Sequence, residues 1–577
     1  MVKFHYRGPY ESSSEEFLLD RLLHPPTTLI AVDTETVSLK DRTMLGFGVA
    51  INPNEAYYIP LWPERSELLE QVYDGLICNP NITKLGHNYG FDLSVFRRFA
   101  LSENRPVPDF NNIHDTGIMA NVSALDAELY KLGIRFTDFK LFTISDLLDE
   151  ARRETGKRNV NMLDVNPELT ALKCMNDVRT TYTVYEEIPK LMNVAMLDCY
   201  QVDRQLFTVL KTIEPKGLKL NQKRVKTYYR KLSDSVEVYQ EWADDHGFSI
   251  SSPAQIGSFL AGEGIVLPPT KSNRQFDTSE EELKKYAGNK YVDPILEYRK
   301  MSKILSTYIE PFIGQERAYT HFRLDLATGR LASASEECVD HVCRNQQNIP
   351  AVNRDIYEPD NGEFLWADMS QLEMRVFAYL TKDETLLKAY SEGQSIHNIT
   401  FKALYPNLSR KITNERGEEV DSPFYVKAKT ANFAMIFDAA ERTIAEQCEI
   451  QLKEARRFKK TWFELYPQAR EYMLQQQSTN STYEETIFGR RMVIPTERGI
   501  HHANKCRINY PVQGSGADLN KRAILSLYKQ GFLTDLRLQV HDEILNDGLF
   551  EFPHELVSNI HPDIYVPWEV KTGPVWT

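Results

Sequence analysis

Two carboxylates stand two residues apart at the end of an apolar run near the N-terminus. In LIAVDTET, this run leads into Asp33 and Glu35. Side chains two apart on a strand point to the same face, so both carboxylates can reach one cation. Hard divalent cations such as Mg²⁺ prefer oxygen ligands and retain several waters. The pair therefore indicates a candidate metal site, although exposed acidic pairs of this kind are also common.

Two further aspartates could complete this site. Asp92 follows a turn rich in Gly and Asn in KLGHNYGFDLSVF, and Asp177 lies in the helical pattern ALKCMNDVRTTYTVYEEI. Taken alone, each is better explained as ordinary helix surface. Two ions about 3.5–4 Å apart can activate a water and stabilise the leaving oxygen of a phosphodiester. A set of four carboxylates would suit that chemistry.

A second acidic group is separated from the first by several hundred residues. FLWADMSQLEMRVFAYL predicts a strand ending at Asp368 and then an amphipathic helix, whereas LRLQVHDEILND predicts a hairpin with Asp542 and Glu543 at its tip. Aspartates on neighbouring strands can bind two ions that activate a hydroxyl and hold a triphosphate. Each could be a turn residue, but the two segments together favour phosphoryl transfer.

Between these aspartates, PFYVKAKTANFAMIF carries one cation and two aromatic rings in a helical pattern. Lys429, Phe433 and Phe437 follow at four-residue steps, which places them on one face of a helix. A lysine can neutralise phosphate charge, and an aromatic ring can stack on a base or sugar. Taken alone, the segment is better explained as an amphipathic core helix.

The elements that must position these residues divide the chain into three parts. The first 190 or so residues alternate β-rich runs with helical patterns, which predicts an α/β domain. A mostly helical connector follows from about 200 to 312, and then a large α+β part. Within that part, the polar stretch 412–423 is predicted to be an exposed loop. Helical patterns then reach about 475, and β-type runs return near 484–495 and 535–550.

Composition excludes several classes of protein. The 577 residues are 42% hydrophobic and 26% charged, as in an ordinary soluble domain, and no apolar run approaches the roughly 18–20 residues of a membrane span. The acidic N-terminus resembles neither a signal nor a transit peptide. We therefore exclude a secreted, membrane or fibrous protein and expect a cytoplasmic one, in the host cytoplasm if it is viral.

Charge and cysteine content narrow the class of protein less than the overall composition does. The net charge of −13 argues against non-specific coating of nucleic acid but allows a local basic face. Seven cysteines predict free thiols in a reducing compartment. Cys338, His341 and Cys343 could suggest zinc, but a tetrahedral site needs a fourth ligand, so a plain loop is the better interpretation.

The first acidic group resembles the DEDD 3′→5′ exonuclease superfamily. The D-x-E at a strand end, the N-x-x-x-D formed by Asn88 and Asp92, and the helical aspartate carry this resemblance. It implies an RNase H-like α/β fold with four metal-binding carboxylates, namely Asp33, Glu35, Asp92 and Asp177. Proofreading members usually carry a tyrosine four residues before the last aspartate to orient the attacking water. Here that residue is Lys173, whose ammonium has three donors and no acceptor.

The second group resembles family A DNA polymerases. D-x-S-Q-x-E-x-R, Q-V-H-D-E and the lysine-bearing helix carry the resemblance, together with TGRLASAS, RNQQNIP, RINYPVQGSGADLNK and SIHNIT. It implies an α+β right-hand polymerase domain over 196–577, after an exonuclease domain over 1–195. The expected subdivisions are a thumb at about 200–318, a palm at about 319–380 and 484–577, and fingers at about 381–483.

The resemblance also implies roles for individual residues. Asp368 and Asp542 would bind catalytic metals with Glu543 in support, and Glu373 would exclude a ribose 2′-hydroxyl. The other nucleotide-binding positions implied are Gln371, His397, Lys429, Phe433 and Phe437. The DNA-binding positions implied are Arg330, Asn348, Asn509, Gln513 and His541.

Four residues depart from the family pattern. Tyr425 stands where the family has an arginine four residues before the lysine, and Lys427 lies about 200° around the helix from Lys429 and cannot easily replace it. Arg410 or Lys411 could supply the cation, but the sequence does not show which. Phe437-Asp438 replaces a Tyr-Gly pair, and Ser395 replaces an aspartate. We expect slower or weaker nucleotide binding.

These observations predict a template-directed DNA polymerase with a proofreading 3′→5′ exonuclease. It would be a monomer that uses two Mg²⁺ ions per active site, with Mn²⁺ as a substitute, and acts on primer-template DNA and dNTPs. A processivity factor, helicase or primase is not identifiable. Because the exonuclease pattern begins within about 30 residues of Met1, no 5′-nuclease domain is expected, as in phage-type replicative enzymes.

Two other functions would account for part of this pattern. A single-subunit RNA polymerase would share the two aspartates and the lysine-bearing helix, but Glu373 and the Asp542-Glu543 pair argue against it. An inactive relative that only clamps nucleic acid is argued against by the intact carboxylates.

Overall fold

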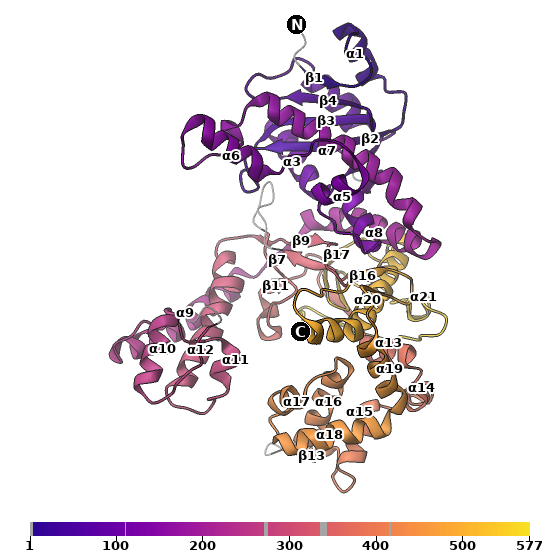
Figure 1. Cartoon of the computed structure of the whole chain (residues 1–577). Helices are drawn as coiled ribbons and strands as arrows, with labels where there is room; N and C mark the ends of the chain where they lie inside the picture. The colour runs from indigo at the N-terminus through magenta and orange to yellow at the C-terminus, as the bar shows by residue number, and fades with distance from the viewer. Residues whose placement is uncertain (1–3, 110, 271–274, 335–342, 415–416) are drawn as a thin grey trace.

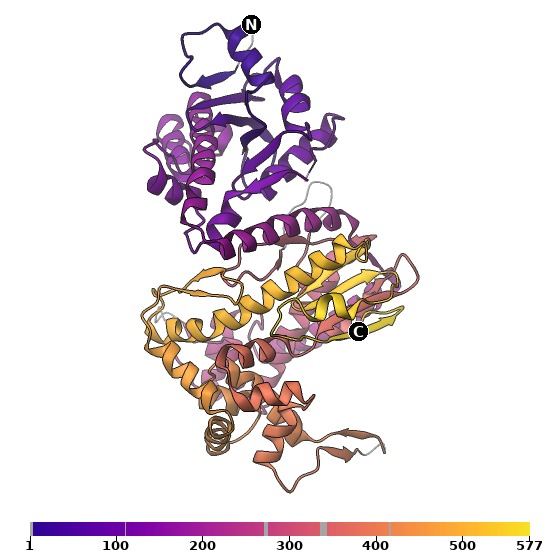
Figure 2. The ribbon, with the colours of Figure 1, turned by 90° about the vertical axis from the view of Figure 1, so that its right-hand side faces the viewer.

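The computed structural model describes residues 4–109, 111–270, 275–334, 343–414 and 417–577. Figure 1 shows an upper α/β part, a central part built on a second sheet, and two helical lobes attached to the central part. Figure 2 shows the upper part stacked on the central part, with α8 running between the two parts and α20 crossing the central part. This arrangement places the two acidic groups in different parts of the molecule.

The upper part is built on a six-stranded sheet with the order β1-β4-β3-β2-β5-β6. Its strands are β1 (His5–Arg7), β2 (Leu29–Thr36), β3 (Met44–Asn52), β4 (Glu55–Pro60), β5 (Thr83–Gly86) and β6 (Ile113–Asp115). The β2 strand pairs antiparallel with β3 and parallel with β5. The predicted strand at LIAVDTET is therefore confirmed, and it lies inside the sheet.

Helices cover both faces of this sheet, so the residues of its inner strands are mostly buried. The helices are α1 (Glu15–Leu23), α2 (Leu69–Val72), α3 (Gly90–Ser102), α4 (Thr116–Val122), α5 (Leu129–Phe136), α6 (Ile144–Thr155) and α7 (Pro167–Glu187). On one face, Phe47 of β3 meets Phe96 of α3 with ring centroids 5.6 Å apart. On the other, Ala31 and Ala50 pack in one apolar cluster with Val178 of α7.

The central part is built on a four-stranded antiparallel sheet with the order β17-β18-β12-β19. Its strands are β12 (Phe364–Met369), β17 (Leu536–Val540), β18 (Glu543–Asp547) and β19 (Trp568–Gly573). The long helix α20 (Ile500–Lys529), which contains Pro511, and the short α21 (His554–Ser558) accompany it. The strand at Asp368 and the hairpin at Asp542 are thus both present as predicted.

Smaller sheets and one connecting helix complete the central part. The small strands are β7 (Leu218–Leu220), β8 (Arg317–Ala318), β9 (His321–Arg323), β10 (Ala332–Ala334), β11 (Tyr357–Glu358), β15 (Tyr483–Glu485) and β16 (Arg491–Val493). Helix α8 (Val194–Ile213) follows the upper part, and Asp203 on it accepts two hydrogen bonds from Arg490, at 2.7 and 2.9 Å. A buried ion pair therefore joins α8 to the central part.

The two lobes are helical. The first consists of α9 (Gln222–Asp245), α10 (Pro253–Gly262), α11 (Glu280–Lys284) and α12 (Val292–Ile304), and it has an apolar core of its own. The second consists of α13 (Leu372–Thr381), α14 (Glu384–Ser391), α15 (Ile396–Leu404), α16 (Pro423–Ile436), α17 (Glu441–Gln447), α18 (Leu452–Leu465) and α19 (Pro467–Ser478). The core of the second lobe is continuous with that of the central sheet.

Two sequence expectations need correction. The stretch 412–423 is not a simple loop, because β13 (Lys411–Thr413) and β14 (Glu419–Asp421) pair antiparallel as a hairpin before α16 begins. Free thiols are present at Cys78, Cys174, Cys199, Cys448 and Cys506. Cys343, in contrast, is disulfide-bonded, so the expectation of free thiols fails there. The other two members of the discarded zinc set, Cys338 and His341, lie outside the described residues.

The absence of an apolar membrane-spanning pattern also has a structural counterpart. Among the helices that the model describes, none combines the length and apolar composition needed to cross a bilayer.

Candidate active sites

The upper acidic group is assembled from three elements. Asp33 and Glu35 come from β2, Asp92 from the first turn of α3, and Asp177 from α7. The backbone N–H and the hydroxyl of Thr34 donate to Oδ1 of Asp92 at 2.8 and 2.6 Å. These bonds tie the start of α3 to the strand that carries the other carboxylates, so the predicted set is gathered at one place.

The turn before α3 is held by a further carboxylate, that of the buried Asp115. Asn88 has a φ of 54°, in the left-handed region, and its N–H donates to Oδ1 of Asp115 at 3.0 Å. The N–H of Tyr89 donates to the other oxygen of Asp115 at 2.8 Å. Asp115 also caps the N-terminus of α4. It therefore orients the turn from which Asp92 projects.

Lys173 lies inside this carboxylate group. Its Nζ is 2.8 Å from Oε1 of Glu35 and 2.7 Å from Oδ2 of Asp177. Burial acts to lower the pKa of Lys173, but the attraction of Asp177 and Glu35 outweighs it and holds that pKa well above the ordinary value. The side chain is thus a fixed positive charge in the centre, a feature that the sequence pattern does not reveal.

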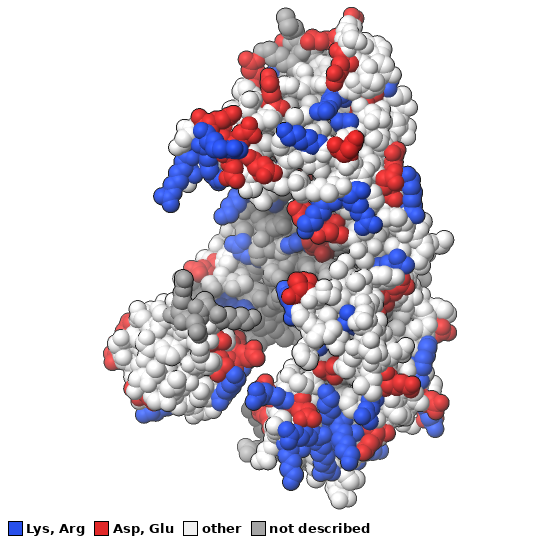
Figure 3. Space-filling model, in the orientation of Figure 1, with Lys and Arg blue, Asp and Glu red and all other residues white. Residues whose placement is uncertain are grey.

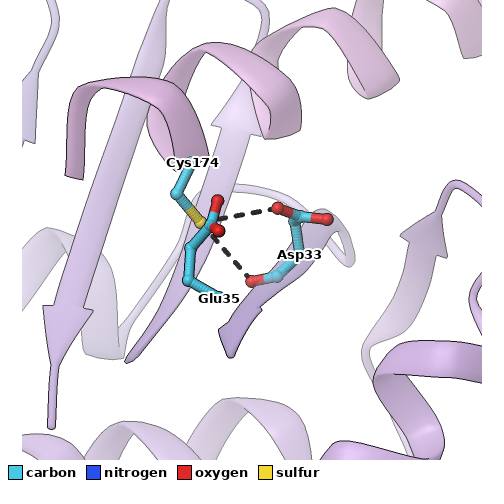
Figure 4. A group of neighbouring side chains, drawn as sticks. All are labelled: Asp33, Glu35 and Cys174. Carbon is cyan, nitrogen blue, oxygen red and sulfur yellow. Dashed lines mark hydrogen bonds between the residues drawn. The ribbon is translucent and has the colours of Figure 1, made fainter. Parts of the chain in front are cut away.

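Cys174, the next residue on α7, also faces the centre (Figure 4). Its Sγ is 3.6 Å from Oδ2 of Asp33 and 3.7 Å from the backbone oxygen of Asp33. Ligand atoms of Asp33, Glu35 and Cys174 lie within 4.8 Å of one another. Because burial and the nearby carboxylates raise the pKa of Cys174 well above its ordinary value, the group is a thiol that donates to Asp33.

The electrostatics of the upper group suit a cation. Burial, followed by the charge of Asp92, raises the pKa of Asp33 well above its ordinary value. Burial raises the pKa of Asp92 to about 7, even though the hydrogen bonds from Thr34 act to lower it. Desolvated carboxylates that repel one another are stabilised by a positive ion. The oxygen donors present fit a hard divalent cation.

The second acidic group lies at the edge of the central sheet. Asp368 is near the end of β12, and Asp542 is in the turn between β17 and β18. The backbone N–H of Met369 donates to the backbone oxygen of Asp542 at 3.2 Å, which fixes the two segments side by side. Both aspartates line one cavity of about 440 Å³. Burial, and then the charges of Asp542 and Glu543, raise the pKa of Asp368 to about 7.

Two glutamates flank Asp368 on the neighbouring strands. In the sheet register, Asp368 is opposite Glu543 on β18 and opposite Glu569 on β19. Glu543 accepts from Nε1 of Trp576 at 3.0 Å and pairs with Arg354 at 3.4 Å. Glu569 instead lines the cavity with the aspartates. The sequence pattern identified Glu543 and missed Glu569, because the pairing of β19 with β12 is not encoded locally.

The other end of the same cavity is basic. Lys429 and Phe433 of α16, His397 of α15, and Arg410 line it. Tyr425, which occupies the place of the family arginine, carries the guanidinium of Arg410 over its ring at 4.4 Å. Burial, and then the charges of Lys429 and Arg410, lower the pKa of His397 to about 4. Carboxylates thus face a basic group across one cavity.

His397 is held by a defined chain of hydrogen bonds. Nε1 of Trp462 donates to Oδ1 of Asn432 at 2.9 Å, and Nδ2 of Asn432 lies 3.1 Å from Nδ1 of His397. An indole N–H can only donate, so the amide oxygen must face Trp462 and the amide nitrogen must donate to His397. Nε2 of His397 therefore carries the proton, and it is buried without a partner among the described residues.

Glu373 separates this cavity from an adjoining one. It lines both, as do Leu372 and Asp542. Its carboxylate pairs with the guanidinium of Arg330. Burial raises the pKa of Glu373, although Arg330 acts to lower it. Gln371 has a φ of 54°, in the left-handed region, and immediately precedes α13, the helix that carries Glu373. It lines the cavity that contains Asp368.

The adjoining cavity, of about 340 Å³, contains several of the predicted DNA-contacting residues. Arg330, Gln513 and His541 line it, and so does Phe437. Asn509 lies one helical turn from Gln513 on α20, and its buried Oδ1 has no hydrogen-bond partner among the described residues. Asn348 does not line either cavity and is exposed in the segment before Pro350. The structure therefore brings three of these residues, Arg330, Gln513 and His541, into one cavity. Asn509 lies beside them on α20, and Asn348 lies outside.

The second helical lobe carries a basic surface. Figure 3 shows Lys and Arg gathered on the lower lobe, over α17 and α18. Exposed cations in these helices are Arg442, Lys453, Arg456, Arg457 and Lys460. The overall charge of −13 therefore coexists with a local basic face, as the composition allowed.

Comparison with known proteins accounts for both parts of the chain. Residues 9–192 match the family model described as 3'-5' exonuclease, and residues 218–565 match that of DNA polymerase family A. The expected order of an α/β exonuclease domain followed by a right-hand polymerase domain is confirmed.

The relatives that match nearly the whole of this chain include bacterial DNA polymerases I. The chain is 25% identical to DNA polymerase I of Borreliella burgdorferi over 95% of its length and 61% of that protein. It is 29% identical to DNA polymerase I of Chloroflexus aurantiacus over 97% of its length and 62% of that protein. The chain thus spans less than two thirds of the length of these relatives.

A solved structure supports the fold. The chain superposes with a TM-score of 0.70 and 20% identity on the POL domain of Pol1 from M. smegmatis, in complex with DNA primer-template and dNTP, covering 95% of each chain. Because the polymerase model also matches more than half of the sequence, the chain belongs to DNA polymerase family A.

Proposed function

We propose that this protein is a template-directed DNA polymerase that also removes nucleotides from the 3′ end of a DNA strand. The observation that carries the polymerase function is the cavity between Asp368 and Asp542 at one end and Lys429 and His397 at the other. A deoxynucleoside triphosphate has an anionic tail for the basic end and an α-phosphate that must reach the acidic end. Both requirements are met within one cavity.

At the acidic end, Asp368 and Asp542 would hold the divalent ions, Mg²⁺ or in its place Mn²⁺. Two such ions, when bound, activate a 3′-hydroxyl and stabilise charge on the reacting phosphate. Glu569 adds negative charge beside Asp368. Glu543 acts indirectly, because its contacts with Trp576 and Arg354 fix the hairpin that carries Asp542.

At the basic end, the side chains bind the triphosphate. Lys429 supplies a point charge, and the protonated Nε2 of His397 donates a hydrogen bond. Phe433 stacks near the sugar or base, with its ring centroid 5.3 Å from that of His397. Glu373 fills the space where a ribose 2′-hydroxyl would lie, which selects deoxynucleotides. Gln371 lines the same cavity.

The adjoining cavity is proposed to receive the primer terminus and the paired template base. Arg330, Gln513 and His541 offer hydrogen-bond donors there. The Oδ1 of Asn509, which has no hydrogen-bond partner among the described residues, lies one turn from Gln513 on α20, and Phe437 also lines the cavity. Asn348 is proposed to contact DNA from outside it.

In the upper part, the four carboxylates are proposed to serve a 3′→5′ exonuclease. Asp33, Glu35, Asp92 and Asp177 would hold the divalent ions that, when bound, activate a water for attack on the terminal phosphodiester. Thr34 orients Asp92 through two hydrogen bonds. The upper site would therefore trim strands that the lower site extends.

The division into subdomains is part of this proposal. We assign residues 1–195 to the exonuclease and 196–577 to the polymerase, with a thumb at about 200–318, a palm at about 319–380 and 484–577, and fingers at about 381–483. The independent core of the α9–α12 lobe supports its assignment to the thumb. We further propose that the protein acts in DNA replication as a monomer of the phage type.

A paired assay on one labelled primer-template tests both activities. With dNTPs and Mg²⁺ the wild-type protein should extend the primer, and without dNTPs it should shorten it. Asp542→Asn should abolish extension and leave shortening intact, whereas Asp33→Ala should do the reverse. Loss of both activities in either variant, with folding unchanged, would contradict two separate active sites.

A further inference from the structure

The ammonium of Lys173 occupies a place in the upper carboxylate group that needs explanation. It bonds Glu35 at 2.8 Å and Asp177 at 2.7 Å, and its side chain is only 11% exposed. Glu35 comes from β2 and Asp177 from the next turn of α7 after Lys173. Lys173 is therefore a buried residue of the site itself, and not a surface side chain that happens to reach the site.

The other two carboxylates have different partners. Asp92 accepts from the N–H and hydroxyl of Thr34, and Asp33 accepts from the thiol of Cys174. These donors are neutral, and the ion pairs found among the described residues include neither Asp33 nor Asp92. Of the four carboxylates, one pair is thus bridged by an internal cation, and the other pair has none.

A bridging ammonium and a bridging divalent ion compete for the lone pairs of the same carboxylate oxygens. Lys173 uses hydrogens to bond Oε1 of Glu35 and Oδ2 of Asp177, so those lone pairs are engaged. A cation placed against them would also be repelled by the ammonium at close range. The repulsion is strong because the site is desolvated.

We propose that Lys173 is an internal counter-ion that competes with one of the two divalent ions of the exonuclease site. The competition is for Glu35 and Asp177, which leaves Asp33 and Asp92 as the side that takes an ion readily. This inference rests on the proposed exonuclease function and adds to it a specific consequence. Trimming requires more divalent metal in this protein than in a variant that lacks the ammonium.

The test is a Mn²⁺ titration in which free Mn²⁺ is followed by its electron paramagnetic resonance signal. The protein is the full chain carrying Asp368→Asn and Asp542→Asn, which removes the aspartates of the other site. In this background, the protein should bind about one Mn²⁺ ion tightly, and a variant with Lys173→Met added should bind about two. We expect the second ion to bind at least about tenfold more tightly after the substitution.

Lys84→Met is the matched control. Lys84 is also a buried lysine of the upper part, but it donates to the backbone oxygen of Asn79 and not to a carboxylate of the site. Its replacement should leave Mn²⁺ uptake unchanged. If Lys173→Met fails to fold, Lys173→Tyr, which keeps a polar side chain, replaces it in the comparison.

The outcomes distinguish a failure of the proposed competition by Lys173 from a failure of the proposed exonuclease function. Equal Mn²⁺ stoichiometry and affinity with and without Lys173 would overturn the competition. Asp33→Ala, added to the same background, should remove the tightly bound ion. If Mn²⁺ uptake persists in that variant, the upper group is not a metal site and the proposed exonuclease fails, whatever Lys173 does.

Discussion

Asn432 donates a hydrogen bond from Nδ2 to Nδ1 of His397 over 3.1 Å. The direction of this bond is set by Trp462, whose indole N–H engages the amide oxygen of Asn432 at 2.9 Å. Together they select the tautomer of His397 that has its proton on Nε2. A buried donor is thereby presented to the cavity, although none of the residues in this chain of bonds carries a formal charge.

Asn432→Asp should disturb nucleotide binding by reversing that bond. A carboxylate accepts and does not donate, so it would favour a proton on Nδ1 of His397 and leave Nε2 without one, or charge the ring. We expect the dNTP KM to rise about tenfold, in line with the loss of one hydrogen bond to a charged phosphate. The ¹⁵N shifts of the His397 ring, assigned with His397→Gln, would report the tautomer directly.

Thr400→Val is the control for this change. The Thr400 hydroxyl also donates to Oδ1 of Asn432, at 3.0 Å, but Trp462 still orients the amide when it is removed. The KM should therefore stay close to that of the wild type. An equal rise in both variants would mean that general loosening of the core, and not the tautomer, controls binding.

His397 should also make stability depend on pH. Its pKa in the folded protein is lowered to about 4, from an ordinary value of 6.5, because burial and the charges of Lys429 and Arg410 oppose its protonation. The unfolded chain thus takes up a proton between pH 6.5 and 4 while the folded protein does not. The stabilisation is complete above pH 6.5 and is lost as the pH falls.

A calorimetric comparison with His397→Gln tests this. Glutamine can still accept from Asn432 but does not titrate, so it lacks the acid-dependent loss. Any advantage of the wild type in the unfolding midpoint at pH 7 should shrink at pH 5. A difference in midpoint that does not change with pH would show that the ring is already protonated in the folded state, or that other groups dominate.

Arg410 offers a cation in place of the family arginine, whose position in α16 is occupied by Tyr425. It lines the cavity beside Lys429, lies over the ring of Tyr425, and pairs through Nε with Asp421 at 3.1 Å. Arg410→Ala should raise the dNTP KM about tenfold with a smaller effect on kcat, as expected when a phosphate contact is lost. Steady-state single-nucleotide insertion measures both constants.

The neighbouring lysine is a matched control. Lys411 pairs with the same oxygen of Asp421 at 3.1 Å but does not line the cavity. Lys411→Ala should therefore change KM less than twofold or so. If the two alanine variants are equally impaired, the hairpin β13–β14 matters for its structure, and Arg410 does not bind the triphosphate.

The sequence predicted those parts of the sites that depend on local pattern. Alternation placed Asp33 and Glu35 on one face of a strand, and hairpin chemistry placed Asp542 at a turn. Arg410 and Glu569 could not be placed in this way. Their positions depend on a hairpin at 411–421 and on the register of β19 against β12, both of which are set by pairing between distant segments. The bridging role of Lys173 was hidden for the same reason, because Glu35 is 138 residues away.

The buried pair of Arg490 with Asp203 gives a prediction for stability. Arg490 makes two bonds to Asp203 of α8, at 2.7 and 2.9 Å, and two to Asp518 of α20, at 2.9 and 2.7 Å. Lys521 adds a bond to Asp203 at 2.7 Å.

Arg490→Met would leave two buried carboxylates facing one lysine, which typically costs about 3–5 kcal/mol. Arg491→Met removes a partly exposed pair with Glu485 at 2.8 Å and should cost at most about 1 kcal/mol. Urea unfolding followed by tryptophan fluorescence compares the two variants. Equal losses would mean that the desolvated carboxylates are relieved by water or by protonation, and that Arg490 is not what holds α8 against the central part.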